Sequence, residues 1–121
     1  MPEDRRIDYV ELPAADFDAA EAFYAGAFGW TFEGYGDGYR AFSDGRLDGG
    51  FHRSELRSRT ENGAALVILY AEDLEDVERR VVACGGTIVK PTFEFPGGRR
   101  FEFRDPHGND LAVWTDRPPA V

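Results

Sequence analysis

Hydrophobic residues recur at helical spacing between Asp16 and Trp30. Asp16 precedes this pattern, and its carboxylate can accept a hydrogen bond from the free N–H groups of a helix start. Gly29 can adopt the left-handed conformation that ends a helix. The pattern therefore predicts a helix that begins after Asp16 and ends at Gly29. Its apolar face has spacings of three and four and comprises Phe17, Ala20, Tyr24, Ala27 and Phe28.

The same helical pattern occurs a second time, 57 residues later. Asp73 corresponds to Asp16 as the helix cap, and Gly86 corresponds to Gly29 as the stop. Between them, Val81 and Cys84 continue an apolar face, so Cys84 is expected in the core. The chain therefore contains two copies of one unit, placed end to end.

Period-two alternation predicts strands before and after each helix. In the first unit the expected strands are 7–12, 30–35, 39–43 and 49–53, and in the second they are 64–71, 87–94, 99–104 and 110–115. Pro91 indicates an edge strand or a bulge in the segment 87–94. Segment 64–71 is apolar throughout, which predicts burial on both faces. Each unit is therefore predicted to be strand–helix–strand–strand–strand, an α+β arrangement.

The length of 121 residues suits one domain that contains both units. Module one is expected at about 5–55 and module two at about 64–116. Residues 54–63 show no periodicity and are predicted to be the linker.

A single helix can cover only one face of each sheet. Alternation places one pair from each of four strands on the helix side: Val10 and Leu12, Val67 and Leu69, Phe101 and Phe103, and Leu111 and Val113. The opposite face mixes aromatic, aliphatic and charged side chains, which suits either a ligand cleft or a sheet with its charges in solvent. Its members are Tyr9, Glu11, Leu66, Ile68, Tyr70, Arg100, Glu102, Arg104, Ala112 and Trp114.

The net charge, the single cysteine and the lack of a membrane-like segment limit which partners and sites are expected. The formal net charge of −9 argues against nonspecific binding of nucleic acid, whose phosphates favour basic surfaces. One cysteine allows neither an intrachain disulfide nor a cysteine-rich zinc cluster. No segment resembles a signal peptide or a membrane span, so a cytoplasmic protein without a membrane partner is expected.

Several short motifs occur in a fixed order along the doubled unit. Together they resemble the vicinal oxygen chelate superfamily, which holds glyoxalases, bleomycin-resistance proteins and extradiol dioxygenases. The similarity runs from about residue 7 to residue 114, and it implies paired βαβββ modules in a curled eight-stranded mixed sheet around a cleft, usually in a dimer. The motifs are Val10-Glu11-Leu12-Pro13, Phe23-Tyr24, Phe28-Gly29-Trp30, Gly49-Gly50, Gly85-Gly86 and Asp105-Pro106-x-Gly108-Asn109.

The resemblance also implies where a metal ion would bind. Metal-using members hold a divalent ion with four His or Glu side chains from the first and last strands of each module. Three of these positions correspond to Tyr9, Leu66 and Ala112, and the fourth falls within 50–52. Leucine and alanine have no donor atoms, and a neutral tyrosine is a poor ligand. We therefore expect no tight metal site and no cofactor.

These residues favour a metal-independent protein that binds a small aromatic or hydrophobic compound, of the resistance or sequestration type. Arg100 or Arg104 is expected to meet an anionic group of the ligand. A homodimer is also expected, because apolar cleft walls are rarely left in water. The expected walls are Tyr9, Phe51, Tyr70 and Trp114, and the other expected binding residues are Glu11, His52 and Leu66.

The alternative is an enzyme: a lyase, isomerase or dioxygenase-like protein with a non-standard metal site or with metal-free acid–base catalysis. Glu11 and Glu102 would form a carboxylate pair for acid–base work if both face the cleft. Glu11 beside Arg100 or Arg104 would instead be a structural ion pair. His52 is a candidate base or a residue at the strand rim, whereas His107 is expected to lie exposed in a turn.

Overall fold

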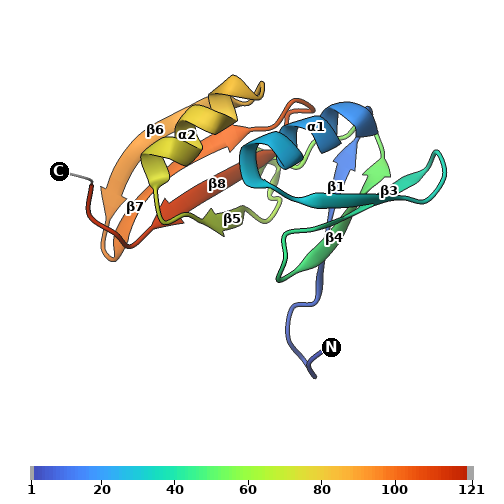
Figure 1. Ribbon diagram of the computed structural model, residues 1–121, viewed down its shortest axis with the longest axis horizontal. Helices are drawn as coiled ribbons and strands as arrows, with labels where there is room; N and C mark the ends of the chain where they lie inside the picture. The colour runs from blue at the N-terminus through green and yellow to red at the C-terminus, as the bar shows by residue number, and fades with distance from the viewer. Residues whose placement is uncertain (1, 120–121) are drawn as a thin grey trace.

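The chain forms two βαβββ modules in the computed structural model, which describes residues 2–119 (Figure 1). Module one comprises β1 (Tyr9–Ala14), α1 (Phe17–Phe28), β2 (Thr31–Gly34), β3 (Tyr39–Ser43) and β4 (Asp48–Arg53). Module two comprises β5 (Val67–Tyr70), α2 (Leu74–Ala83), β6 (Thr87–Phe95), β7 (Gly98–Arg104) and β8 (Asp110–Thr115). A 3-10 turn, Thr60–Asn62, lies in the linker. The α+β class and the doubled unit are confirmed.

Each module contributes its own four-stranded sheet. The strand orders are β1-β4-β3-β2 and β5-β8-β7-β6, and the first pair in each sheet is parallel. A parallel pair needs a long crossover, which each helix helps to supply. The strands therefore pair as two separate sheets instead of one continuous eight-stranded sheet, and β1 and β5 each have a free edge. On β6 the ladder shifts register on both sides of Lys90, as Pro91 indicated.

Both helices begin at the predicted caps. Asp16 accepts a hydrogen bond from the Ala19 N–H at 3.0 Å, and Asp73 accepts one from the Asp76 N–H at 3.1 Å. Gly29 ends α1 with a φ of 75°.

The end of α2 differs from the prediction. The left-handed residue is Gly85, with a φ of 103°, and the helix already stops at Cys84. Gly86 is required for space instead, because a Cβ there would lie 2.7 Å from a methyl carbon of Val81 and 2.9 Å from the Phe23 ring. Cys84 is only half-buried. Its sulfur faces Gly26 of α1, where an added Cβ would lie 2.8 Å from it.

Helix α1 is shared between the two modules. Its Tyr24 ring lies 5.5 Å from Phe51 of β4, and its Phe23 ring lies 5.9 Å from Phe103 of β7. Figure 1 shows α1 and α2 on the same side of the two sheets. The buried set of α1 therefore differs from the predicted stripe, because it includes Phe23 and leaves Phe28 half-buried: Phe17, Ala20, Phe23, Tyr24 and Ala27.

The predicted faces of module two are largely correct. Phe101 and Phe103 are fully buried on the helix side of β7, while the three charged residues between and beside them are half-buried on the other side. Strand β5 is the exception. Ile68 is 43% exposed and Tyr70 is 47% exposed, so the expectation of burial on both faces is wrong. The reason is that both helices lie on the other side of the sheets and leave this face of β5 uncovered (Figure 1).

The turn between β7 and β8 docks module two onto module one. Asp105 is buried, and one of its carboxylate oxygens accepts hydrogen bonds from the N–H groups of His107, Gly108 and Asn109 at 2.9–3.0 Å. Its other oxygen accepts the Tyr24 hydroxyl hydrogen at 2.8 Å. Burial and the negative charge of Asp105 raise the pKa of Tyr24, so this hydroxyl remains a donor.

Asn109 and His107 extend this docking network. The Asn109 amide donates to the Pro13 carbonyl at 2.9 Å and accepts the Ser58 N–H at 2.8 Å. His107 Nδ1 accepts the Ala15 N–H at 3.3 Å, which leaves Nε2 to donate to the Leu56 carbonyl at 2.7 Å. The half-buried His107 therefore bridges module one and the linker, and the expectation that it is simply exposed is wrong.

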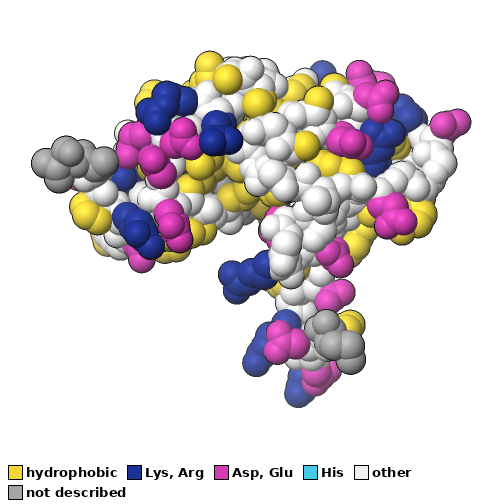
Figure 2. Space-filling view, viewed as in Figure 1, with side chains coloured by type: hydrophobic (Ala, Val, Ile, Leu, Met, Phe, Trp, Pro, Cys, Tyr) yellow, Lys and Arg dark blue, Asp and Glu magenta, His cyan; other side chains and the backbone are white. Residues whose placement is uncertain are grey.

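The surface carries charges of both signs. On the face shown in Figure 2, acidic and basic side chains are interspersed over both modules. Within residues 2–119, no helix is long and apolar enough to span a membrane.

Candidate functional site

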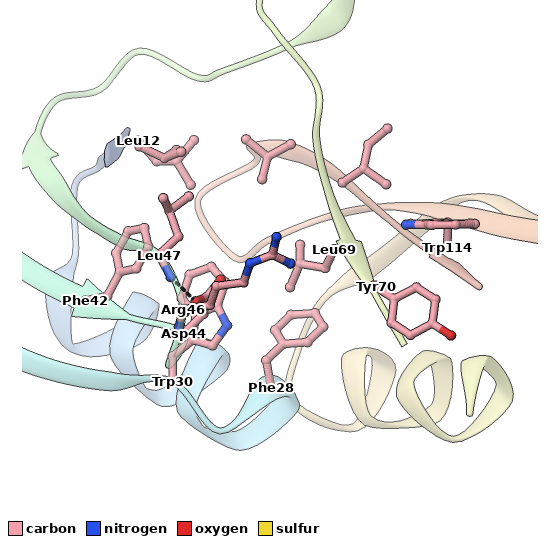
Figure 3. A pocket seen from close by; sticks show the side chains of 13 residues that line it. Leu12, Phe28, Trp30, Phe42, Asp44, Arg46, Leu47, Leu69, Tyr70 and Trp114 are labelled. Carbon is pink, nitrogen blue, oxygen red and sulfur yellow. Dashed lines mark hydrogen bonds between the residues drawn. The ribbon is translucent and has the colours of Figure 1, made fainter. Parts of the chain in front are cut away.

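A cavity of about 610 Å³ lies between the free edges of β1 and β5, and we call it the inter-module cavity (Figure 3). Aromatic rings from both modules border it. Module one contributes from α1, the segment after it and β3, and module two contributes from β5 and β8. These rings are Phe28, Trp30, Phe42, Tyr70 and Trp114.

The remaining apolar walls come from the helix-facing sides of the edge strands. Val10 and Leu12 of β1 line the cavity from module one, and Val67 and Leu69 of β5 line it from module two. The alternation of these strands was predicted from the sequence, but the gap between them was not. Two helices placed side by side do not fully cover the space between two separate sheet edges.

The aromatic rings differ in how much surface they offer to a ligand. Trp30 is buried, with Tyr24 stacked 4.5 Å from one side and Phe42 stacked 4.6 Å away. Tyr70 and Trp114 retain exposed surface and meet edge to face at 5.2 Å. Trp30 therefore supplies part of the cavity wall, whereas Tyr70 and Trp114 have surface available for stacking.

The polar groups of the cavity come mainly from the turn between β3 and β4. Asp44 closes this turn by accepting the N–H groups of Arg46 at 2.8 Å and Leu47 at 2.6 Å. Gly45 has a φ of 96°, which favours glycine at this turn. The Arg46 side chain extends from the turn into the cavity (Figure 3). No motif or alternation in the sequence marked these turn residues as site residues.

The open face of sheet one, opposite the helices, carries a chain of hydrogen bonds. The Tyr39 hydroxyl donates to Glu11 at 3.0 Å and accepts from the Tyr9 hydroxyl at 2.6 Å. Burial, followed by the hydrogen bonds to Tyr9 and Glu11, raises the pKa of Tyr39. The Tyr39 ring lies over Gly50, where an added Cβ would overlap it. Tyr39 was missed from the sequence, although the Gly49-Gly50 pair signalled a close approach of some group.

The open face of sheet two carries paired charges. Arg100 contacts Glu102 at 2.9 Å, and Arg104 contacts Asp110 at 2.8 Å. These arginines are therefore already neutralised, which argues against either one as the receptor of an anionic ligand group. On the other sheet, Glu11 accepts a hydrogen bond from Tyr39, and none of the ion pairs among residues 2–119 joins Glu11 to Arg100 or Arg104.

Three further predicted residues lie away from the inter-module cavity. Phe51 is fully buried against Tyr24 and Phe42, so its expected place in a cleft wall is wrong. His52 is exposed near the end of β4, and Leu66 is half-buried just before β5. Of the predicted binding residues, the structure brings together only Tyr70 and Trp114 at this cavity.

The fourth position implied for a metal ion can now be placed. In sheet one, Gly50 of β4 pairs with Glu11 of β1. In sheet two, Ala112 of β8 pairs with Ile68 of β5, and Ile68 is the residue 57 positions after Glu11. Gly50 is therefore the counterpart of Ala112.

The residues at the four positions do not fit a divalent ion. Tyr9 is hydrogen-bonded to Tyr39, whose ring covers Gly50. Leu66 and Ala112 have no donor atoms. Within residues 2–119, no group of three or more His, Cys, Asp or Glu side chains is arranged to hold a metal ion.

Comparisons with known proteins agree with this fold. The chain is 32% identical over 124 residues to the anthracycline biosynthesis protein DnrV of Streptomyces peucetius, an alignment that covers 88% of this chain and 45% of that protein. The chain thus spans about half the length of this curated relative.

Solved structures show the same architecture. A glyoxalase/bleomycin resistance protein/dioxygenase family enzyme from Burkholderia phytofirmans PsJN matches with a TM-score of 0.75 at 19% identity, covering 91% of this chain and 98% of that one. A lactoylglutathione lyase from Agrobacterium tumefaciens matches with a TM-score of 0.71 at 25% identity, covering 93% and 95%. Residues 6–113 match the family model itself. The chain belongs to the Glyoxalase/Bleomycin resistance protein/Dioxygenase superfamily.

Proposed function

We propose that this protein binds a small aromatic compound in the inter-module cavity without a bound metal ion, as a sequestration or resistance protein would. The observation that carries the proposal is the cavity itself. Its volume of about 610 Å³ falls in the range of roughly 300–1,000 Å³ that is typical of small-molecule sites. Aromatic and aliphatic side chains with few polar groups also form the walls of such sites.

The similarity to DnrV supports the class of ligand. That protein is named for anthracycline biosynthesis, and anthracyclines contain a fused aromatic ring system. A flat ring system gains from stacking on half-exposed aromatic side chains such as Tyr70 and Trp114, by about 0.5–1.5 kcal/mol per ring pair beyond the area buried. A polycyclic aromatic compound is therefore the proposed ligand class.

The proposal does not depend on acid–base catalysis. The three candidate catalytic residues lie on separate elements: Glu11 on β1, His52 on β4 and Glu102 on β7. Glu102 is held by Arg100 and Glu11 by Tyr39. An acid and a base must both reach the same reacting group, and these side chains are not arranged around the inter-module cavity. Binding is therefore favoured over the enzyme alternative.

Tryptophan fluorescence provides a direct test, because both tryptophans of the chain border the cavity. We expect anthraquinones or anthracyclines to quench the emission saturably, with a micromolar or lower Kd, equally in buffer with and without EDTA. Trp114→Ala should weaken binding about tenfold, read from the remaining Trp30, because a stacking ring is lost. Tyr35→Ala is the matched control, since this exposed aromatic residue does not border the cavity.

Free N-acetyltryptophanamide controls for collisional quenching and light absorption by the ligand. Loss of quenching in EDTA would refute the metal-independent part of the proposal. The absence of saturable quenching across an aromatic panel would refute the binding function itself.

We also propose that the protein forms a homodimer. The outer edge strands of the two sheets, β2 and β6, offer unpaired backbone groups away from the inter-module cavity, and Val89 on β6 is exposed. Light scattering at micromolar concentration should give twice the mass of one 13.5 kDa chain. A mass of one chain at this concentration would contradict the proposal.

A further inference from the structure

The polar lining of the inter-module cavity is restricted to few groups. Asp44 and Arg46 are the charged residues that border it, and both belong to the turn between β3 and β4. The Asp44 carboxylate is already used to close this turn through the backbone N–H groups of Arg46 and Leu47. The Tyr70 hydroxyl is likewise used, because it donates to Asp116 at 2.6 Å.

The guanidinium of Arg46, unlike these two groups, makes no hydrogen bond to another residue among residues 2–119. None of the ion pairs among residues 2–119 involves Arg46, and no side-chain hydrogen bond of Arg46 occurs among them. By contrast, Arg100 and Arg104 on the open face have carboxylate partners at 2.9 and 2.8 Å. Arg46 therefore offers free donors to a ligand at the mouth of the cavity.

The side chain of Arg46 is placed to contact an anionic ligand group. Figure 3 shows its side chain extending between the wall that contains Trp30 and the wall that contains Leu69. Arg46 is exposed at the cavity mouth, so solvent reaches its charge, and its value to a ligand lies in the geometry of its donors. A planar guanidinium also matches a carboxylate with two parallel hydrogen bonds.

We propose that the ligand of the inter-module cavity is an aromatic compound that carries an acidic oxygen group, such as a carboxylate, and that Arg46 determines this specificity. The inference rests on the proposed function and adds the chemical class of the ligand. The aromatic walls hold the ring system, and Arg46 binds the anionic group at the cavity mouth. The sequence predicted that Arg100 or Arg104 would meet this group. The proposal assigns that contact to Arg46 instead, which lies in a turn.

The test compares two probes of the same shape, 2-naphthoate and its neutral amide, 2-naphthamide. Their affinities are measured by ligand-observed NMR. For the unchanged protein we expect 2-naphthoate to bind about tenfold more tightly, which corresponds to about 1.4 kcal/mol. Arg46→Gln should abolish this preference while leaving the affinity for 2-naphthamide unchanged. Arg46→Lys should keep part of it, since lysine retains the charge without the planar fork.

Arg79→Gln is the matched control. It removes the same charge from an exposed position on α2 and should leave the preference for 2-naphthoate intact. Equal binding of the two probes, or a preference that survives in Arg46→Gln, would overturn the inference and leave the proposed function standing. If neither probe binds and the aromatic panel also fails to quench tryptophan emission, the proposed function and the inference are both refuted.

Discussion

Asp105→Ala should lower the free energy of unfolding by about 3–5 kcal/mol, the range seen when one partner of a buried charged network is removed. Asp105 accepts hydrogen bonds from three backbone N–H groups of its own turn, from the Asn109 amide and from the Tyr24 hydroxyl. Without the carboxylate, the fully buried Tyr24 hydroxyl has no other partner among the described residues. Urea denaturation followed by circular dichroism measures the change.

A double-mutant cycle with Tyr24→Phe separates the contact between modules from the turn itself. Tyr24→Phe alone removes a hydrogen bond to a charged group, which is worth about 1.5–3 kcal/mol. The double variant has no unpaired hydroxyl. Its loss in free energy of unfolding should therefore be smaller than the sum of the losses in the two single variants. Strict additivity, or a loss below about 1 kcal/mol for Asp105→Ala, would show that this network does not hold the modules together.

Phe103→Ala should also cost about 3–5 kcal/mol, the usual loss for a fully buried phenylalanine. Phe103 is a contact point between module two and the shared helix. Its ring lies 5.9 Å from Phe23 and 5.8 Å from Phe28, both on α1. The cavity left by the truncation would therefore open at the centre of the common core. Thermal or urea unfolding measures the loss.

Phe28→Ala is the matched comparison. Phe28 is half-buried and borders the inter-module cavity, so its truncation removes less buried surface, and the loss should be about 1–2 kcal/mol. A loss at Phe28 equal to that at Phe103 would contradict the description of Phe28 as a cavity wall. The sequence alone placed Phe28 on the buried helix face, because periodicity does not report where a neighbouring surface ends.

Local signals in the sequence predicted most elements. The caps at Asp16 and Asp73 and the strands Tyr39–Ser43 and Asp110–Thr115 agree with the structure, since each depends on residues close in the chain. The predicted strand 64–71 is shortened to Val67–Tyr70, whereas the predicted strand 87–94 extends to Phe95. Local pattern therefore predicted the type of each element better than its burial.

The arrangement of the two modules was beyond the reach of local pattern. The repeated helices were visible in the sequence, but the sharing of α1 between two cores depends on contacts such as Phe23 with Phe103, 80 positions apart. The cavity consequently uses Leu12 and Leu69, which alternation had assigned to the core. Likewise, alternation could not show that the Tyr39 ring covers Gly50 from the neighbouring strand.

The turns that connect the third and fourth strands of the two modules are topologically equivalent, yet only one is docked. The turn that contains Asp105 is fastened to Tyr24 and Pro13 of the other module. The turn that contains Arg46 is closed by its own Asp44 and borders the cavity. Because the exposed Arg46 side chain contributes little to the core, it can be replaced at low cost in stability while Asp44 and Gly45 keep the turn closed. The proposed ligand preference can thus diverge during evolution at Arg46 while the doubled fold is preserved, an asymmetry that an exact tandem repeat would not provide.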